Sequence, residues 1–157
     1  MAELKPFTEP SQWAYGRSYA AAAVVAVTGA DLVISDAGGG AVTAGEALNM
    51  TAGATNLELT ASIAGWYLVN LTGSVLQATA NEQIICSLFK TPSGGAAAVV
   101  TGSEAVAESS GAALAGPIVS SAVIFLAASD KVHAYARREL NNMNITFNGS
   151  LTAVRVR

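Results

Sequence analysis

Charged side chains are scarce in this sequence. Only 12% of its 157 residues are charged, while 52% are hydrophobic; an ordinary soluble domain has about 25% charged residues. So few polar groups would leave much apolar surface exposed on an isolated subunit. Because obligate oligomers bury more hydrophobic interfaces than transient complexes do, the composition predicts a single domain that works as an obligate oligomer.

Long hydrophobic runs, basic clusters and a signal peptide are also missing. A membrane helix needs about 20 consecutive apolar residues, and the longest candidates, Tyr19–Val27 and Ala122–Ala128, are much shorter. The eight basic residues are scattered and the net charge is −3, which argues against binding to nucleic acid. Charges and prolines between Glu3 and Glu9 interrupt any signal-peptide core. We therefore expect synthesis in the cytosol, with neither membrane nor nucleic acid as a partner.

Cysteine and histidine occur once each, as Cys86 and His133. One cysteine excludes an internal disulfide framework, and one cysteine with one histidine is too few for a zinc site. Cys86 alternates with Ile84 and Leu88, which is typical of a strand face turned into a core. A reactive Cys86–His133 pair would require an activating neighbour that the sequence lacks, so we expect a buried, inert thiol.

Other catalytic patterns are equally weak. The glycine triplet at residues 38–40 is not followed by Lys-Ser/Thr, so it predicts a turn rather than a phosphate-binding loop. Paired carboxylates for glycoside hydrolysis would have to come from Glu82, Glu104 or Glu108, and we expect Glu104 and Glu108 to be solvated loop acids. The sequence predicts no enzyme, no cofactor and no metal site, and leaves open only a carbonyl-lined ion site on an oligomer axis.

What the chain does contain is a series of short apolar segments separated by turn residues. Turn residues at regular intervals between short apolar segments are typical of a β-sandwich. We therefore expect residues 17–157 to form one all-β, antiparallel domain. The expected strands are Tyr19–Val27, Gly65–Leu76, Gln83–Lys90, Ile118–Ala128, Lys131–Arg137, Met143–Phe147 and Ser150–Arg157.

Residues 1–16 differ from the rest. They hold two of the four prolines and the aromatic residues Phe7, Trp13 and Tyr15. Proline disfavours a regular helix, and the aromatic rings need an apolar surface to cover them. We expect an extended N-terminal arm whose aromatic residues contact a partner.

The expected strand Gly65–Leu76 carries information about assembly. Tyr67, Val69 and Leu71 fall on one face, as a sandwich core requires. The opposite face starts with Trp66 and Leu68, and then turns polar. Since burying such a side chain is worth about 2 kcal/mol, their outward position predicts a covering subunit. The interface candidates are Trp66, Leu68 and Asn70 on this strand, and Tyr135 on the outer face of Lys131–Arg137.

Three short motifs carry a family resemblance: Ala64-Gly65-Trp66-Tyr67-Leu68-Val69, Ser129-Asp130-Lys131-Val132 and Phe147-Asn148-Gly149-Ser150-Leu151. In their order and spacing they resemble the Gly-x-Tyr strand, the Gly-Asp-x-Val turn and the Phe-x-Gly-x-Leu strand of the C1q and TNF superfamily of trimeric jelly rolls. The resemblance implies a homotrimer with Leu68 facing its axis. Ser129 departs from the family pattern, which has glycine there.

A short arm followed directly by a trimeric jelly roll is similar to the capsid decoration, or cement, proteins of tailed bacteriophages. This likeness implies a non-enzymatic structural protein on the virion surface that bridges and stabilises subunits of the major capsid protein. The alternative is a recognition module of the same superfamily, such as the receptor-binding head of a phage fibre.

Overall fold

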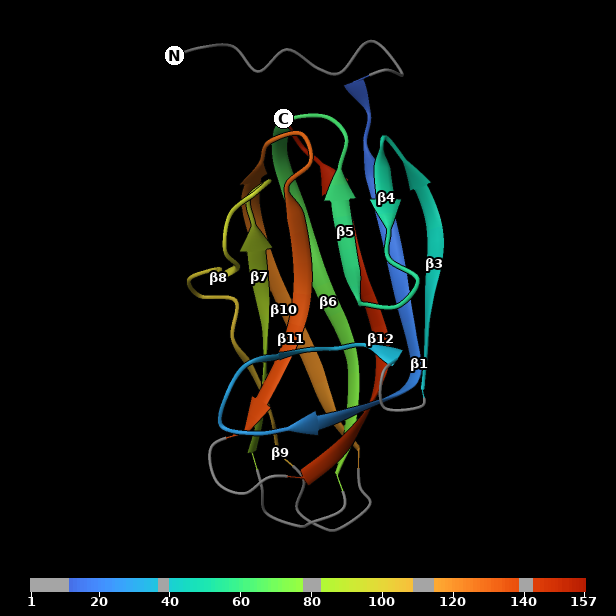
Figure 1. Ribbon diagram of the computed structural model, residues 1–157, viewed down its shortest axis with the longest axis vertical. Helices are drawn as coiled ribbons and strands as arrows, with labels where there is room; N and C mark the ends of the chain where they lie inside the picture. Colours follow the sequence, from blue (N-terminus) through green and yellow to red (C-terminus); the bar gives the residue numbers. More distant parts are fainter. Residues whose placement is uncertain (1–11, 37–39, 78–82, 109–114, 139–142) are drawn as a thin grey trace.

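The protein folds into two β-sheets packed face to face, as Figure 1 shows for the computed structural model. The structure describes residues 12–36, 40–77, 83–108, 115–138 and 143–157. Its strands are β1 (Tyr15–Val27), β2 (Leu32–Val33), β3 (Ala41–Leu48), β4 (Met50–Ala52), β5 (Glu58–Ala61), β6 (Gly65–Gln77), β7 (Gln83–Thr91), β8 (Ala98–Val99), β9 (Ala105–Glu108), β10 (Ala115–Leu126), β11 (Lys131–Arg138) and β12 (Met143–Arg155). Within these residues, no helix is long and apolar enough to cross a bilayer.

The strands form two antiparallel sheets. Sheet A has the order β10-β6-β12-β1-β3, and sheet B has the order β4-β5-β11-β7-β8, with β2 beside β11 and β9 beside β7. Neighbours in both sheets come from distant parts of the chain, for example β1 and β12. The predicted antiparallel sandwich is confirmed.

The core lies between the sheets. Tyr67, Val69 and Leu71 on β6 have no exposed surface, and they belong to the same buried cluster as Leu88 and Val132 of sheet B. The period-2 pattern of β6 therefore predicted its inner face correctly, because alternate side chains of a strand point to opposite faces.

The last strand differs from the prediction. We expected two strands, Met143–Phe147 and Ser150–Arg157; this was wrong, since β12 runs unbroken from Met143 to Arg155.

A bulge in the neighbouring strand explains why Asn148-Gly149 is extended here. β1 bulges near Ala22, whose φ of 55° is left-handed, and the freed Ala22 N–H donates to Asn148 Oδ1 at 2.7 Å. A Cβ on Gly149 would lie 2.2 Å from Thr72 O, so only glycine allows β6 to approach so closely. Asn148-Gly149 has the sequence of a hairpin turn, but here it lies within a strand and contacts both neighbouring strands.

The N-terminal boundary also falls earlier than the division at residue 16 suggested. β1 begins at Tyr15, which pairs with Val154 on one side and Leu48 on the other. Tyr15 and Gly16 are therefore members of sheet A. Residues 1–11, which include Phe7, lie outside the described part of the chain, so the expected arm stays a prediction.

The turn between β10 and β11 is where the sequence placed it, at Ser129-Asp130. The Ser129 N–H donates to Ala61 O at 2.7 Å, which ties the turn to β5. Ser129 adopts a φ of 71°, a left-handed conformation that glycine takes without cost and most other residues take with strain.

Ser129→Gly is expected to stabilise the protein by about 0.5–1 kcal/mol, because release of this strain outweighs the added freedom of the unfolded chain. The measurement is the free energy of unfolding in a chemical denaturant. Ser129→Ala, which keeps the strained φ, is the control and should give no gain. Equal stability of the two variants would contradict the strain argument.

Candidate functional site

The outer face of sheet A carries large apolar side chains that no part of the described chain covers. On β6, Trp66 is 44% exposed and Leu68 37% exposed, while their neighbours Tyr67 and Val69 are buried in the core. Exposed apolar side chains that stand alone are ordinary on protein surfaces, so the question is whether these two are isolated.

The register of sheet A shows that they are not. Phe125 on β10 lies opposite Trp66, and the two rings meet edge to face with centroids 5.6 Å apart. In the next outward-facing row, Val123 lies opposite Leu68. Phe125 is about as exposed as Trp66, and Val123 is more exposed than Leu68. The two strands therefore form one apolar surface.

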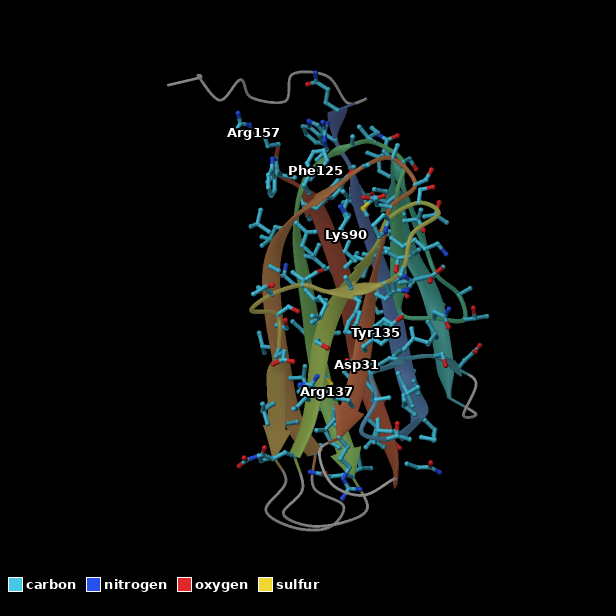
Figure 2. The ribbon with its side chains drawn as sticks, turned by 60° about the vertical axis from the view of Figure 1, so that its left-hand side comes forward. Asp31, Lys90, Phe125, Tyr135, Arg137 and Arg157 are labelled. Carbon is cyan, nitrogen blue, oxygen red and sulfur yellow. The ribbon has the colours of Figure 1, made fainter. Side chains whose placement is uncertain are left out.

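The same row continues across the sheet. Leu68 lies opposite Val154 on β12, and Val154 lies opposite Tyr15 on β1. Half of the Val154 side chain is exposed. We call the whole surface the apolar belt; it consists of Tyr15, Trp66, Leu68, Val123, Phe125 and Val154. Figure 2 places Phe125 close to Arg157, at the C-terminal end of the sandwich.

The belt ends abruptly at the next row. There Asn70 faces Ser121 on β10 and Thr152 on β12, and the Ser121 hydroxyl donates to Asn70 Oδ1 at 2.6 Å. The predicted candidates Trp66 and Leu68 are thus central to the belt, while Asn70 borders it with its side chain already engaged inside the subunit.

The first described residues extend the apolar surface beyond the sheet. Trp13 is 56% exposed. It lines a shallow cavity of about 250 Å³ together with Ala14, Tyr15, Val154 and Arg155. Two hydrogen bonds hold this segment, from Asn49 Nδ2 to Trp13 O and from Arg155 Nη1 to Gln12 O, each 2.6 Å long. Of the arm candidates, Tyr15 therefore belongs to the belt and Trp13 lies beside it.

Tyr135 does not join the other interface candidates. It lies on β11 in sheet B, where its ring packs against Phe89 with centroids 4.1 Å apart. The alternation of β11 correctly predicted that Tyr135 faces outward. It could not tell which of the two sheets would contain the strand.

The structure separates the two residues that might have formed a thiol-based site. Cys86 points into the core, and burial raises the pKa of its thiol to about 12. His133 is on the outer side of sheet B, next to Glu58. The expected inert, buried thiol agrees with this placement.

The acidic candidates are engaged in surface contacts rather than paired for hydrolysis. Glu104 accepts a hydrogen bond from Arg137 at 2.8 Å, and Glu108, at the end of β9, accepts one from the Gln83 amide. Both had been expected as solvated loop acids. Among the described residues, no group of three or more His, Cys, Asp and Glu side chains could hold a metal ion; Glu82 and residues 38–39 lie outside them.

Comparison with known proteins establishes the fold. No protein-family model matches this sequence, and no curated protein matches it either. Solved structures do match. That of Eiger TNF from S. frugiperda covers 92% of this chain and 93% of its own with a TM-score of 0.66 and 12% identity. Murine APRIL at pH 8.5 covers 92% and 99% with a TM-score of 0.61 and 10% identity.

The chain therefore has a TNF-like jelly-roll fold. At these identities the likeness shows the fold alone, and it confirms the architecture that the sequence motifs predicted. Sequence reasoning missed three residues of the belt, Val123, Phe125 and Val154. The available signal was a β10 segment that is apolar on both faces, with Ile124 and Leu126 turned inward.

Proposed function

We propose that this chain is the non-enzymatic subunit of a homotrimer, and that the trimer decorates and stabilises a virus capsid. The observation that carries the proposal is the apolar belt on sheet A. Covering a half-exposed aromatic ring removes on the order of 100 Å² from water, worth about 2.5 kcal/mol. Trp66 and Phe125 together with three aliphatic side chains therefore supply a strong driving force for self-association.

A threefold arrangement is supported by the resemblance to the C1q and TNF superfamily, whose jelly rolls assemble as trimers. In such an arrangement Leu68 faces the axis, and the belts of three subunits cover one another. The low charge content of the chain fits a subunit that is not exposed on all sides.

The capsid role is supported by the position of the N-terminal segment. Trp13 and Tyr15 lie at the same end of the sandwich as the belt, so three arms would emerge close together from one end of the trimer. Aromatic anchors on extended arms suit attachment to neighbouring capsid subunits, and the bridges would resist pressure from inside the shell. The protein would be made in the host cytoplasm and would act on the virion surface.

The experiment combines native mass with binding to capsids. Light scattering should give the mass of a trimer, and the trimer should co-sediment with purified capsid shells of the virus that encodes it. Removal of residues 1–11 together with Trp13→Ala should abolish co-sedimentation but keep the trimer, because both changes leave β1 intact.

Each part of the proposal has its own contrary result. A monomer would contradict the assembly. A trimer that does not co-sediment with the shells would contradict the capsid role and favour the alternative, a receptor-binding head or another recognition module.

A further inference from the structure

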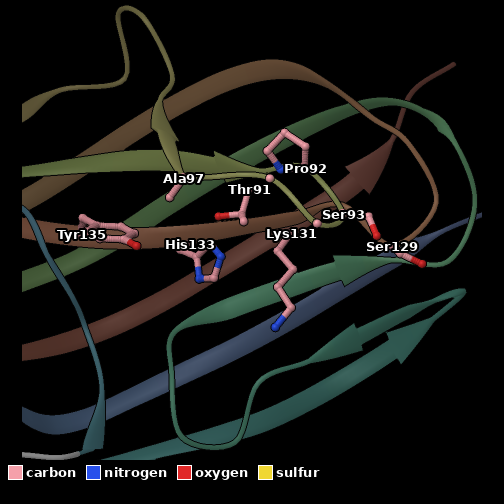
Figure 3. Close-up of a pocket in the computed structure, with 10 residues that line it drawn as sticks. Thr91, Pro92, Ser93, Ala97, Ser129, Lys131, His133 and Tyr135 are labelled. Atoms are coloured by element: carbon pink, nitrogen blue, oxygen red, sulfur yellow. The ribbon is translucent and has the colours of Figure 1, made fainter.

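A second feature of the molecule lies on the opposite side from the belt. The outer face of sheet B, beside the turn that follows β7, is hollowed into an open cavity of about 440 Å³. Figure 3 shows the side chains that surround it. The polar ones are those of Thr91, Ser93, Ser129, Lys131, His133 and Tyr135. A volume of this size is in the range of small-molecule sites, roughly 300–1,000 Å³.

The pairing of β11 determines which side chains meet there. Lys131 lies opposite Thr91 of β7, and His133 lies between Phe89 of β7 and Glu58 of β5. Val132 and Ala134, which alternate with them, are in the core. One face of β11 therefore supplies an ammonium group, an imidazole and a phenol in succession.

His133 is the unusual member of this wall. His133 is only 8% exposed, yet its Nε2 atom has no hydrogen-bond partner among the described residues. Nδ1 lies 3.1 Å from Glu58 Oε2 but outside hydrogen-bond geometry, so neither ring nitrogen has a hydrogen-bond partner among the described residues. Buried polar atoms are nearly always satisfied, so an imidazole with two unsatisfied nitrogens in the wall of a cavity indicates a missing polar group.

The charges of the site cancel. Lys131 Nζ lies 3.2 Å from Glu58 Oε1, which pairs one positive charge with one negative charge. Burial, and to a smaller extent the charge of Lys131, lower the pKa of His133 despite the nearby Glu58 carboxylate, so the imidazole is neutral at pH 7. An anion would meet Glu58 and a cation would meet Lys131. The site suits an uncharged ligand rich in hydroxyl groups.

The cavity also offers a rigid apolar surface. The Tyr135 ring is held against Phe89, and Pro92 and Ala97 contribute aliphatic groups to the wall. A pyranose ring has hydroxyl groups around its rim and C–H groups on its faces, so it matches a wall that mixes hydroxyls, an amine and an aromatic ring.

We propose that this cavity binds one neutral sugar residue, with hydroxyl groups of the sugar bonded to Thr91, Lys131 and His133. Because Nε2 of His133 is itself almost inaccessible, the hydroxyl that reaches it must displace a neighbouring side chain. Lys131, whose side chain is 43% exposed on a flexible stem, has the freedom to rotate. The cavity lies within one subunit and on the sheet that does not carry the belt, so assembly through the belt leaves it open.

The test uses the full-length protein and a panel of methyl glycosides of glucose, galactose, mannose, N-acetylglucosamine and rhamnose. Saturation-transfer NMR should detect binding of at least one of them. His133→Phe, which keeps a ring but removes both nitrogens, and Thr91→Val, which removes one hydroxyl in a partly exposed position, should each weaken binding about tenfold or more. Thr43→Val, on the exposed face of β3 in sheet A, is the matched control and should bind as the unmodified protein does.

A glycan array identifies the source of the sugar. Signals from oligosaccharides that end in the same sugar, and that are lost in both variants, assign the site to the end of a surface glycan; binding of the methyl glycoside alone assigns it to a free sugar. Absence of binding in both formats would overturn the proposal. Binding that neither variant weakens would overturn it as well, and Thr91→Val keeps this test valid should His133→Phe fail to fold.

Discussion

Leu68→Asp is expected to break the proposed trimer into monomers. Leu68 is at the centre of the apolar belt, with Val123 on one side and Val154 on the other. In the trimer the variant would bring three carboxylates together in an apolar interface, where burying an unpaired charge costs several kcal/mol. We expect the dissociation constant to rise by at least about 100-fold, which corresponds to about 3 kcal/mol.

Light scattering across a range of protein concentrations measures this effect. Val106→Asp is the matched control, because Val106 is also an exposed apolar residue but lies on β9 in sheet B, and this variant should remain trimeric. Leu68→Ala should show a smaller weakening and guards against the possibility that the charged variant aggregates. A soluble, well-folded trimer of Leu68→Asp would contradict the proposed interface.

Asp130→Ala is expected to cause the largest loss of subunit stability among the surface-loop substitutions. Asp130 is only 4% exposed and follows the strained turn residue Ser129. Its carboxylate accepts hydrogen bonds from the N–H groups of Ser93 at 3.0 Å and Ala127 at 2.9 Å, and it pairs with Lys90 Nζ at 3.0 Å. This one side chain therefore connects the β10–β11 turn with the end of β7.

The expected loss is about 3 kcal/mol, because two backbone donors and a half-buried ammonium group lose their acceptor together. For a domain of this size that lowers Tm by roughly 6–12 °C at a fixed protein concentration. Asp31→Ala is the control. Asp31 contacts Arg137 at 3.7 Å in a partly exposed pair, so its removal should change Tm little.

The effect of Asp130→Ala should also depend on pH. Burial raises the pKa of this carboxyl, but the hydrogen bonds from Ala127, Lys90 and Ser93 lower it by more, so the folded pKa is below its ordinary value. The stabilisation is therefore complete above the unfolded pKa of about 3.9 and is lost as the pH falls from there through the folded pKa. The difference in Tm between the two proteins should be constant near neutral pH and should narrow below about pH 4. A difference that does not change with pH would show that the charge of Asp130 contributes nothing.

Local sequence patterns were sufficient wherever the decisive interactions lie within one strand or one turn. The alternation of β6 placed Tyr67 in the core and Leu68 outside, and the Ser129-Asp130 dipeptide marked the β10–β11 turn. In both cases the backbone geometry of a few consecutive residues fixes the outcome.

Local sequence patterns were insufficient where the structure depends on two strands that are far apart in the sequence. The Asn148-Gly149 dipeptide is typical of a turn, but in the structure it lies beside a bulge in β1. The Ala22 N–H of that bulge donates to Asn148 Oδ1. Tyr135 faces outward as its alternation requires, but its sheet is chosen by the pairing of β11 with β7 and β5.

The sequence by itself determined that this protein is an all-β sandwich with a buried thiol, an outward-facing Trp66 and Leu68, and few charges. Only the tertiary structure decided that Phe125, Val123 and Val154 lie beside those residues, and that Thr91, Lys131 and His133 surround one cavity. The physical reason is that alternation along a strand sets which face a side chain occupies, whereas its neighbours on that face depend on strand order and register. Both are set by packing of the whole chain.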